Sequence, residues 1–173
     1  MTADYRRHTY VDTSLGRLLL VAANEALTGL YFPEHWYPPK ESEIGGAVDA
    51  DSDAVFDVAA KQLHDYLAGT RRSFELPIRT NGDDFAERVW ALLREIPYGE
   101  TTTYGTLAAT LASKGLSQRV GQAVGHNPIS IVIPCHRVVG ADGSLTGFAG
   151  GLHRKRTLLD LEEPAETRAD RLF

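Results

Sequence analysis

The sequence predicts a mixed α/β (α+β) protein, in which a small antiparallel sheet with one helix precedes a mostly helical part. Short runs rich in β-branched and aliphatic residues, separated by turn residues, fill the beginning of the chain. Apolar residues at helical spacing dominate from residue 84 onward. Between these parts, residues 79–83 contain an Asn-Gly pair, which is typical of a turn. We therefore expect an N-terminal domain at residues 1–80 and a C-terminal domain at residues 84–173.

In the first part, turn residues between the early runs predict a meander. Residues 33–46 hold three prolines and two adjacent glycines, which predicts a surface loop. Residues 51–67 carry apolar side chains at helical spacing, with Ser52 or Asp53 as the N-cap and Gly69 as the stop. Four runs have the composition of strands: residues 7–11, 17–23, 27–32 and 74–78.

In the second part, residues 129–133 are apolar and β-rich, which predicts a strand that leads to Cys135. Residues 113–116 form a short connection with the turn glycine and the dimensions of a helix-turn-helix. Four runs have helical spacing: residues 84–96, 103–112, 117–125 and 155–162.

Composition excludes several classes of protein. The chain has 173 residues, of which 43% are hydrophobic and 24% charged, as in ordinary globular proteins. Its longest apolar runs are far shorter than the roughly 20 residues of a membrane helix. Residues 1–10 are polar and lack the apolar core of a signal peptide, so we expect no membrane partner and a cytoplasmic protein. The single cysteine excludes an internal disulfide and a cysteine-rich structural zinc site, and we expect no metal or cofactor.

Charge is distributed unevenly along the chain. The net charge is −5, and residues 1–83, with 8 Lys and Arg against 13 Asp and Glu, account for all of it. Residues 104–156 carry six basic residues and one acidic residue, Asp142. Any single basic residue is usually part of a solvated face. A long stretch with six basic residues and one acidic residue, however, indicates a surface that binds phosphate, while residues 1–83 form an acidic scaffold.

The cysteine lies in the run Ile133-Pro134-Cys135-His136-Arg137-Val138. Free cysteines are most often small buried hydrophobes, which is the simplest interpretation of its position. A cysteine is a nucleophile only as the thiolate, and a neighbouring imidazole and guanidinium are the kinds of group that lower a thiol pKa. These neighbours make Cys135 the candidate nucleophile.

Three ordered blocks resemble the O6-alkylguanine-DNA alkyltransferases, also called methylated-DNA-protein-cysteine methyltransferases. Residues 127–140, which contain the Pro-Cys-His-Arg-Val run, resemble the active-site signature of that family. Residues 143–152 resemble the loop that lines its alkylguanine pocket, and residues 155–162 resemble its closing helix. Residues 97–105 resemble the start of its helix-turn-helix. The first 80 residues match only in length and in a loose strand pattern.

The resemblance implies direct-reversal DNA repair. An O6-alkylguanine, with O4-alkylthymine as a further candidate substrate, would be flipped out of duplex DNA by a minor-groove helix-turn-helix. Its alkyl group would be transferred irreversibly to Cys135, once per protein molecule, because no second cysteine is present to resolve the thioether. Double-stranded DNA containing the lesion is the expected partner. The protein would be a monomer with no obligate protein partner, and cooperative assembly on DNA is left open.

The resemblance also implies catalytic roles. Cys135 would be the nucleophile, His136 its base through a bound water, and Glu162 the group that orients the imidazole. Tyr104 would crowd the target phosphate and donate a proton to the leaving guanine; taken alone, it is equally a core aromatic at a helix start. Asn127 would hold the turn before Cys135; taken alone, it is a helix-stop residue before a proline.

The implied DNA contacts lie on the helix-turn-helix. Where the family has an arginine that fills the gap left by the flipped base, this chain has Gln118. Gln118 as a shorter wedge and Arg119 as its substitute remain alternatives, and phosphate binding is a further interpretation of Arg119. The full set is Thr103, Tyr104, Ser117, Gln118, Arg119, Gly121, Gln122 and Ala123.

The implied pocket surrounds the cysteine and the glycine-rich loop. Phe148 stands where the family often has tyrosine, and Ala149 where it often has serine, so stacking is kept and hydroxyl contacts are lost. Arg137 is expected to be structural, either tying the two domains together or neutralising local charge. The pocket set is Pro134, Val138, Leu145, Thr146, Gly147, Phe148, Ala149, Gly150 and Lys155.

Two other classes remain as alternatives. In a hydrolytic cysteine enzyme, Cys135 and His136 would attack an acyl group, but the sequence has no obvious oxyanion motif and does have a helix-turn-helix. In a non-reactive damage-recognition module or transcription regulator, the cysteine would be replaced, and this chain keeps it.

Overall fold

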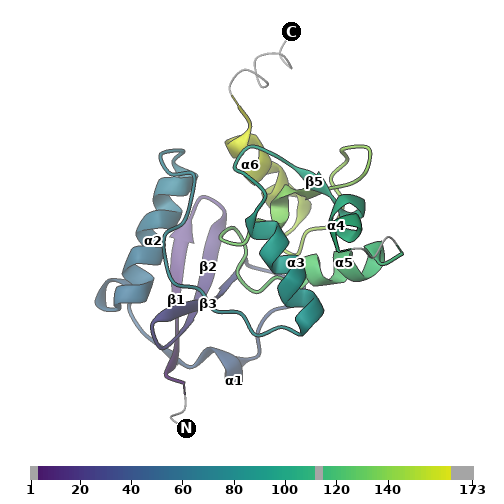
Figure 1. Ribbon diagram of the computed structural model, residues 1–173. Coiled ribbons are helices and arrows are strands. Elements are labelled where there is room, and N and C mark those ends of the chain that lie inside the picture. The colour runs from purple at the N-terminus through teal and green to yellow at the C-terminus, as the bar shows by residue number, and fades with distance from the viewer. Residues whose placement is uncertain (1–3, 112–114, 165–173) are drawn as a thin grey trace.

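The computed structural model describes residues 4–111 and 115–164, which form a small sheet with one long helix beside a cluster of four helices (Figure 1). Strands β1 (Arg6–Thr13), β2 (Gly16–Ala23) and β3 (Ala26–Tyr31) form an antiparallel meander. Strand β4 (Gly46–Ala47) pairs in parallel with β1, so the sheet order is β3-β2-β1-β4. The three early strands are thus confirmed, with their ends shifted by one or two residues.

The strand expected at residues 74–78 is wrong. In this segment only Ile78 makes a β-bridge, an isolated one with Leu27. The side chain of Gln62 instead donates to the carbonyl of Glu75 and accepts from its N–H, both at 2.9 Å. Pro77 has no N–H to donate. The backbone of Glu75 is therefore satisfied by a side chain, whereas β3 meets this segment at Leu27, which donates to the carbonyl of Pro77 and accepts from the N–H of Arg79.

The loop expected at residues 33–46 also needs correction, because it contains the short helix α1 (Glu41–Ile44). The carboxylate of Glu43 accepts from the N–H of Lys40, which closes the first turn of this helix.

Helix α2 (Ala54–Leu67) follows a 3₁₀ turn, η1 (Ala50–Ser52), and covers one face of the sheet (Figure 1). Of the two expected caps, Asp53 is the N-cap: its carboxylate accepts from the N–H groups of Val55 and Phe56. The same carboxylate pairs with the guanidinium of Arg7 on β1, so the cap also fixes the helix against the sheet. The chain turns away at Gly69, whose φ of +82° suits glycine.

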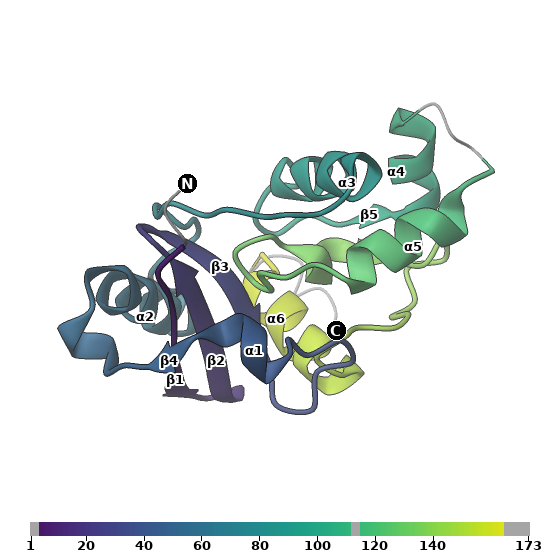
Figure 2. The same cartoon turned by 90° about the horizontal axis from the view of Figure 1, so that it is seen from below.

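The second half holds helices α3 (Asp84–Arg94), α4 (Tyr104–Thr110), α5 (Ser117–Gly125) and α6 (Leu152–Glu162). Strands β5 (Thr102–Thr103) and β6 (Val138–Val139) form a two-stranded parallel pair in the same half. The four expected helices are confirmed with small shifts at their ends. Of the expected turn at residues 113–116, residues 113 and 114 lie outside the described residues. Helix α5 packs against both α3 and α4 (Figure 2).

The strand expected at residues 129–133 is wrong as well. The N–H of Val132 donates to the carbonyl of Ser130 at 2.8 Å, around Ile131 with φ +72°. This is a γ-turn of the rare left-handed kind, and a β-branched residue adopts that φ only under constraint. The constraint is visible next to it, because Leu30 on β3 donates to Pro128 and accepts from Ser130. The sheet therefore holds the segment that leads to the cysteine.

Within the described residues, no helix is long and apolar enough to cross a membrane.

Candidate active site around Cys135

Cys135 begins a 3₁₀ turn, η2 (Cys135–Arg137), immediately after a second tight turn. Its N–H donates to the carbonyl of Ile133 at 2.8 Å around Pro134, whose φ of −82° and ψ of 64° define an inverse γ-turn. The side chain of Asn127 spans this region: it donates to the carbonyl of Ile133 at 2.8 Å and accepts from the N–H of Ile129 at 3.0 Å. Asn127 thus lies where it can hold the turn before the cysteine, as expected.

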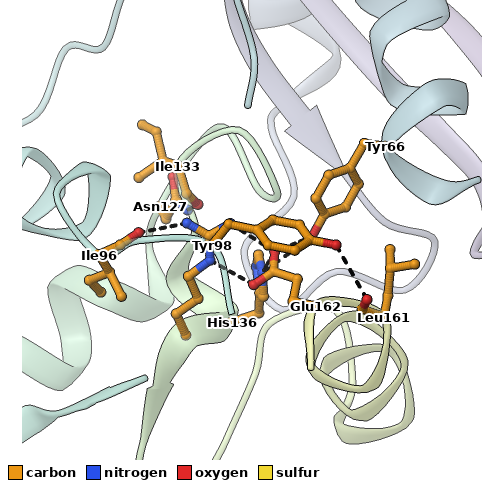
Figure 3. Close-up of polar contacts among 9 residues, drawn as sticks. Tyr66, Ile96, Tyr98, Asn127, Ile133, His136, Leu161 and Glu162 are labelled. Carbon is orange, nitrogen blue, oxygen red and sulfur yellow. Dashed lines mark hydrogen bonds and ion pairs between the residues drawn. The ribbon is translucent and has the colours of Figure 1, made fainter. Parts of the chain in front are cut away.

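His136, the residue after the cysteine, forms a buried pair with Glu162 (Figure 3). Nε2 of His136 lies 2.8 Å from Oε2 of Glu162. Because an ionised carboxylate can only accept, Nε2 carries the proton and Nδ1 carries the lone pair. Burial lowers the pKa of His136 and keeps the ring neutral. Nδ1 is a buried atom with no hydrogen-bond partner among the described residues, so it is the ring atom left to accept a proton.

Glu162 is held ionised by the donors that surround it. Burial alone would raise the pKa of this carboxyl, but hydrogen bonds from His136 and Arg137 outweigh burial and lower the pKa to about 2. Arg137 donates from Nε to Oε1 at 2.7 Å and from Nη2 to Oε2 at 2.8 Å. Its Nη1 donates to the carbonyl of Ile96 at 2.6 Å. These three hydrogen bonds lie within the second half of the chain, so Arg137 neutralises the buried carboxylate rather than tying the two halves together.

Two tyrosines that sequence reasoning missed complete this cluster (Figure 3). The hydroxyl of Tyr66, on α2, donates to Oε2 of Glu162 and so joins the N-terminal helix to the C-terminal one. The hydroxyl of Tyr98 donates to the carbonyl of Leu161 at 3.3 Å. Nothing in the local pattern of α2 separates Tyr66 from an ordinary core residue, since its partner is 96 positions away.

The thiol of Cys135 is only 5% exposed. Burial raises its pKa, while Asn127 and the positive charge of Lys155 act to lower it. Lys155 is itself buried, which lowers its pKa to about 8, and its Nζ donates to the carbonyl of Thr146 at 3.2 Å. The amine is therefore partly able to lose its charge near neutral pH. Among residues 4–111 and 115–164, no three His, Cys, Asp or Glu side chains are grouped to hold a metal ion.

A cavity of about 410 Å³ opens above the cysteine, a volume within the range of small-molecule sites. Helix α5 supplies one side and the glycine-rich loop the other. The hydroxyl of Tyr104 accepts from that of Thr146 at 3.2 Å, which joins α4 to the loop. The lining residues are Trp36, Tyr104, Ser117, Gln118, Gly121, Val124, Gly125, Cys135, Thr146, Gly147, Phe148 and Ala149.

The other residues expected in the pocket lie behind or beside this cavity. Pro134 caps η2, and Val138 is fully buried in β6. Leu145 borders a different hollow, next to Arg156. Gly150 packs so tightly that an added Cβ would lie 2.3 Å from the ring of Phe32. Like Lys155, these residues support the walls without lining the space.

The expected DNA-contact residues do not all share one face. Ser117, Gln118 and Gly121 line the cavity, and Thr103 caps α4 through its hydroxyl. The guanidinium of Arg119 lies 4.1 Å above the ring of Phe85 on α3, facing away from the cavity. Gln122 borders the same hollow as Arg119. Ala123 is buried, and its carbonyl accepts from Nε1 of Trp90 at 2.8 Å.

Trp36 is the lining residue that sequence reasoning missed most clearly, because it comes from the loop after β3. Its N–H donates to the carbonyl of Ala149 at 3.0 Å, and its indole lies against Gly147, where an added Cβ would meet it at 2.6 Å. Arg154 fixes the loop by donating to the carbonyls of Pro33 and Gly150. The N-terminal half thus contributes one wall of the cavity.

Comparisons with known proteins agree with this geometry. Residues 6–80 match the sequence model of the 6-O-methylguanine DNA methyltransferase ribonuclease-like domain, and residues 84–164 match that of its DNA-binding domain. The Methylated-DNA--protein-cysteine methyltransferase of Mycobacterium tuberculosis is 42% identical over 153 residues, 88% of this chain and 90% of the relative. That of Haemophilus influenzae is 40% identical over 169 residues, 94% and 88% of the two chains.

Solved structures give the same result. The crystal structure of Mycobacterium tuberculosis OGT in complex with DNA superposes with a TM-score of 0.81 at 39% identity, and the match covers 93% of this chain and 97% of that one. An O6-methylguanine DNA methyltransferase from Methanococcus jannaschii superposes with a TM-score of 0.63 at 26% identity, with 88% and 92% covered. Both halves of the chain are thus matched in sequence and in fold, and the chain belongs to the 6-O-methylguanine DNA methyltransferase family.

Proposed function

We propose that this protein repairs DNA by direct reversal, transferring the alkyl group of O6-alkylguanine in duplex DNA to Sγ of Cys135. The observation that carries the proposal is the position of the cysteine at the cavity beside α5, next in sequence to His136, which is paired with Glu162. The family membership and the DNA-bound relative support it. Each molecule would act once, in the cytoplasm, as a monomer and without a cofactor. O4-alkylthymine and cooperative assembly on DNA belong to the tests below.

Base flipping would be performed by the face of α5 that borders the cavity. Ser117 and Gly121 are small there, which lets the helix backbone approach the minor groove closely. Gln118 faces the same space, while Arg119 is stacked on Phe85. We therefore assign Gln118 as the wedge in the gap left by the base, and Arg119 as a residue that fixes α5 on α3.

The chemistry requires a proton acceptor for the thiol and a proton donor for the leaving base. The thiol of Cys135 gives its proton through a bridging water to Nδ1 of His136, and Glu162 stabilises the imidazolium that forms. Sγ then attacks the alkyl carbon in line: the S–C bond forms as the C–O6 bond breaks, and the electron pair leaves on the guanine oxygen. The negative charge is shared between O6 and N1 of the base; the hydroxyl of Tyr104, at the cavity, supplies the proton, which ends on N1, and Tyr104 is reprotonated from His136 through solvent. The products are unmodified guanine and an S-alkylcysteine.

Recognition of the flipped base would depend on the loop at Thr146–Ala149 rather than on hydroxyl side chains. Phe148 is 4% exposed and packs on Phe32, so it supports the loop from inside. Backbone N–H and carbonyl groups of Gly147 and Ala149 can then meet the edge of the base. Trp36 presents an indole 55% exposed at the rim, where it can contact the extrahelical nucleotide.

The direct test is incubation with duplex DNA that carries one O6-methylguanine, followed by intact and peptide mass measurement. We expect one addition of about 14 Da, confined to Cys135 and saturating at one equivalent. Cys135→Ser should bind the duplex and acquire no mass. Tight lesion binding without an adduct in the natural protein would indicate a recognition module. Burst and turnover on an ester, without alkylation, would indicate a hydrolase.

The assignment of the wedge is tested with two neighbouring variants. Gln118→Ala should slow repair of the duplex and leave the reaction with the free base O6-benzylguanine unchanged, because the free base needs no flipping. Arg119→Ala is the matched control and should lower the melting temperature while keeping the duplex rate. An unchanged duplex rate for Gln118→Ala would exclude it as the wedge.

A further inference from the structure

The hydroxyl of Tyr66 is placed where it can act on the catalytic pair from the other half of the molecule. Tyr66 is 1% exposed and lies on the face of α2 that packs toward the C-terminal half. Its hydroxyl donates to Oε2 of Glu162 and lies 3.5 Å from Nε2 of His136 (Figure 3). Helix α2 carries none of the residues assigned to the reaction, and Tyr66 is the residue through which it meets the catalytic pair in the hydrogen bonds described above.

The carboxylate of Glu162 is already saturated by stronger donors. Oε1 accepts from Nε of Arg137, and Oε2 accepts from Nη2 of Arg137 and from Nε2 of His136. Tyr66 adds a third donor to Oε2, the same oxygen that binds the imidazole. Burial, with the charge of Glu162, raises the pKa of Tyr66, so the phenol remains a neutral donor throughout the working pH range.

The ring of Tyr66 alone would satisfy the packing. It lies 5.3 Å from the ring of Phe74 and stands edge-on to Tyr98 at 6.2 Å, contacts that a phenylalanine would keep. A buried hydroxyl without a hydrogen-bond partner destabilises the fold. The partner of this hydroxyl is Oε2 of Glu162, the same oxygen that accepts from His136, the general base. Every donor to that oxygen reduces the negative charge available to an imidazolium.

Resting on the function proposed above, we propose that Tyr66 is a positioning residue of the alkyl-transfer site. Its hydroxyl holds Oε2 of Glu162 against Nε2–H of His136, which keeps the lone pair on Nδ1. The same hydrogen bond makes protonation of His136 less favourable. The N-terminal domain thereby sets the pH at which the relay works. The other charged groups that face His136 are Arg137 beside it and Lys155 on α6, and both disfavour its protonation.

Tyr66→Phe is expected to strengthen the hold of His136 on its proton. The hydroxyl of Tyr66 donates to the carboxylate of Glu162 whether or not His136 is protonated, so only part of its strength bears on His136. The acid limb of the rate profile should therefore move upward by about half to one pH unit. The plateau rate at higher pH should change little, because His136 is deprotonated there in both proteins.

The experiment is single-turnover methyl transfer from duplex O6-methylguanine, measured from about pH 4.5 to about pH 9, a range that extends below the usual histidine pKa because burial lowers the pKa of His136. Tyr98→Phe is the matched control: it removes a hydroxyl from the same cluster that binds the carbonyl of Leu161. Its profile should coincide with that of the unchanged protein. An unshifted profile for Tyr66→Phe, or an equal shift in both variants, would overturn the inference.

Two further readouts keep the two proposals separate. Nitrogen NMR titration of His136 in the DNA-free protein reports the same upward shift and the Nε2–H tautomer without any reaction. Tyr66→Met, which also lacks the hydroxyl, should reproduce the shift if the phenylalanine variant is unstable. If the unchanged protein fails to methylate Cys135, the proposed function fails; if it methylates normally and the titration is unaltered by either variant, only the role of Tyr66 fails.

Discussion

Glu162→Gln should destabilise the protein by an amount that depends on pH. The pKa of Glu162 falls from 4.5 to about 2 on folding. A shift of that size corresponds to about 3 kcal/mol, at 1.36 kcal/mol per unit. Because the folded pKa is depressed, this contribution is present above the unfolded pKa and is lost as pH falls through the folded one. Glutamine cannot ionise, so the variant lacks the contribution at every pH and also leaves the guanidinium of Arg137 without its carboxylate.

The assay is urea unfolding of both proteins at several pH values, followed by tryptophan fluorescence, since Trp90 is buried. The difference in unfolding free energy should be about 3 kcal/mol at neutral pH and about half of that near pH 3. Glu95→Gln, at an exposed carboxylate just after α3, is the control and should show almost no difference. A difference below about 1 kcal/mol at neutral pH, or one that stays constant down to pH 3, would refute the reasoning.

Three other predictions concern the walls of the site. Gly150→Ala should lower stability by about 1–3 kcal/mol, because its Cβ would press on Phe32; thermal unfolding measures this, with Gly46→Ala, which meets nothing within 4 Å, as the control. Lys155→Met should raise the pKa of Cys135 and therefore slow alkylation of this thiol by iodoacetamide, by up to about tenfold at neutral pH. The alkylation rate is measured by mass spectrometry, and an unchanged rate would contradict the charge effect. Trp36→Ala should slow duplex repair several-fold, up to about tenfold, without changing the melting temperature. Tyr37→Ala, at a neighbouring exposed ring stacked on His126, should leave the duplex rate intact.

Local signals predicted most of the fold. The cap at Asp53, the helical spacing of α2 to α6 and the turns of the meander are properties of short segments, and they were read correctly. The strand prediction for the segment before Cys135 is wrong, because four of its five residues are apolar and β-branched, as in a strand, while the actual pair of γ-turns depends on a side chain from Asn127. At residues 74–78, likewise, the side chain of Gln62 takes the place of a strand partner at Glu75, and pairing with β3 is limited to an isolated bridge at Ile78.

The candidate site divides in the same way. Cys135 and His136 are adjacent in the sequence, so one short motif identifies both as candidates. The resemblance indicates Glu162 as the partner of the imidazole, and its Oε2 lies 2.8 Å from Nε2 of His136. Tyr66 and Trp36 come from the first half of the chain, and no spacing rule connects them with residues 96 and 111 positions later. The burial of Ala123 could not be predicted from the sequence, because it depends on how Trp90 of α3 packs against α5.

The burial of Cys135 has a consequence for the lifetime of the unused protein. A thiol with a raised pKa and almost no exposed surface reacts slowly with peroxides and with small electrophiles. A protein that acts only once could no longer repair DNA after its cysteine had reacted with such a compound. Shielding preserves the sulfur until a lesion occupies the cavity above it. The low reactivity of the resting thiol therefore keeps unused molecules able to act, and the number of lesions a cell can repair would equal the number of molecules whose cysteine is still unmodified.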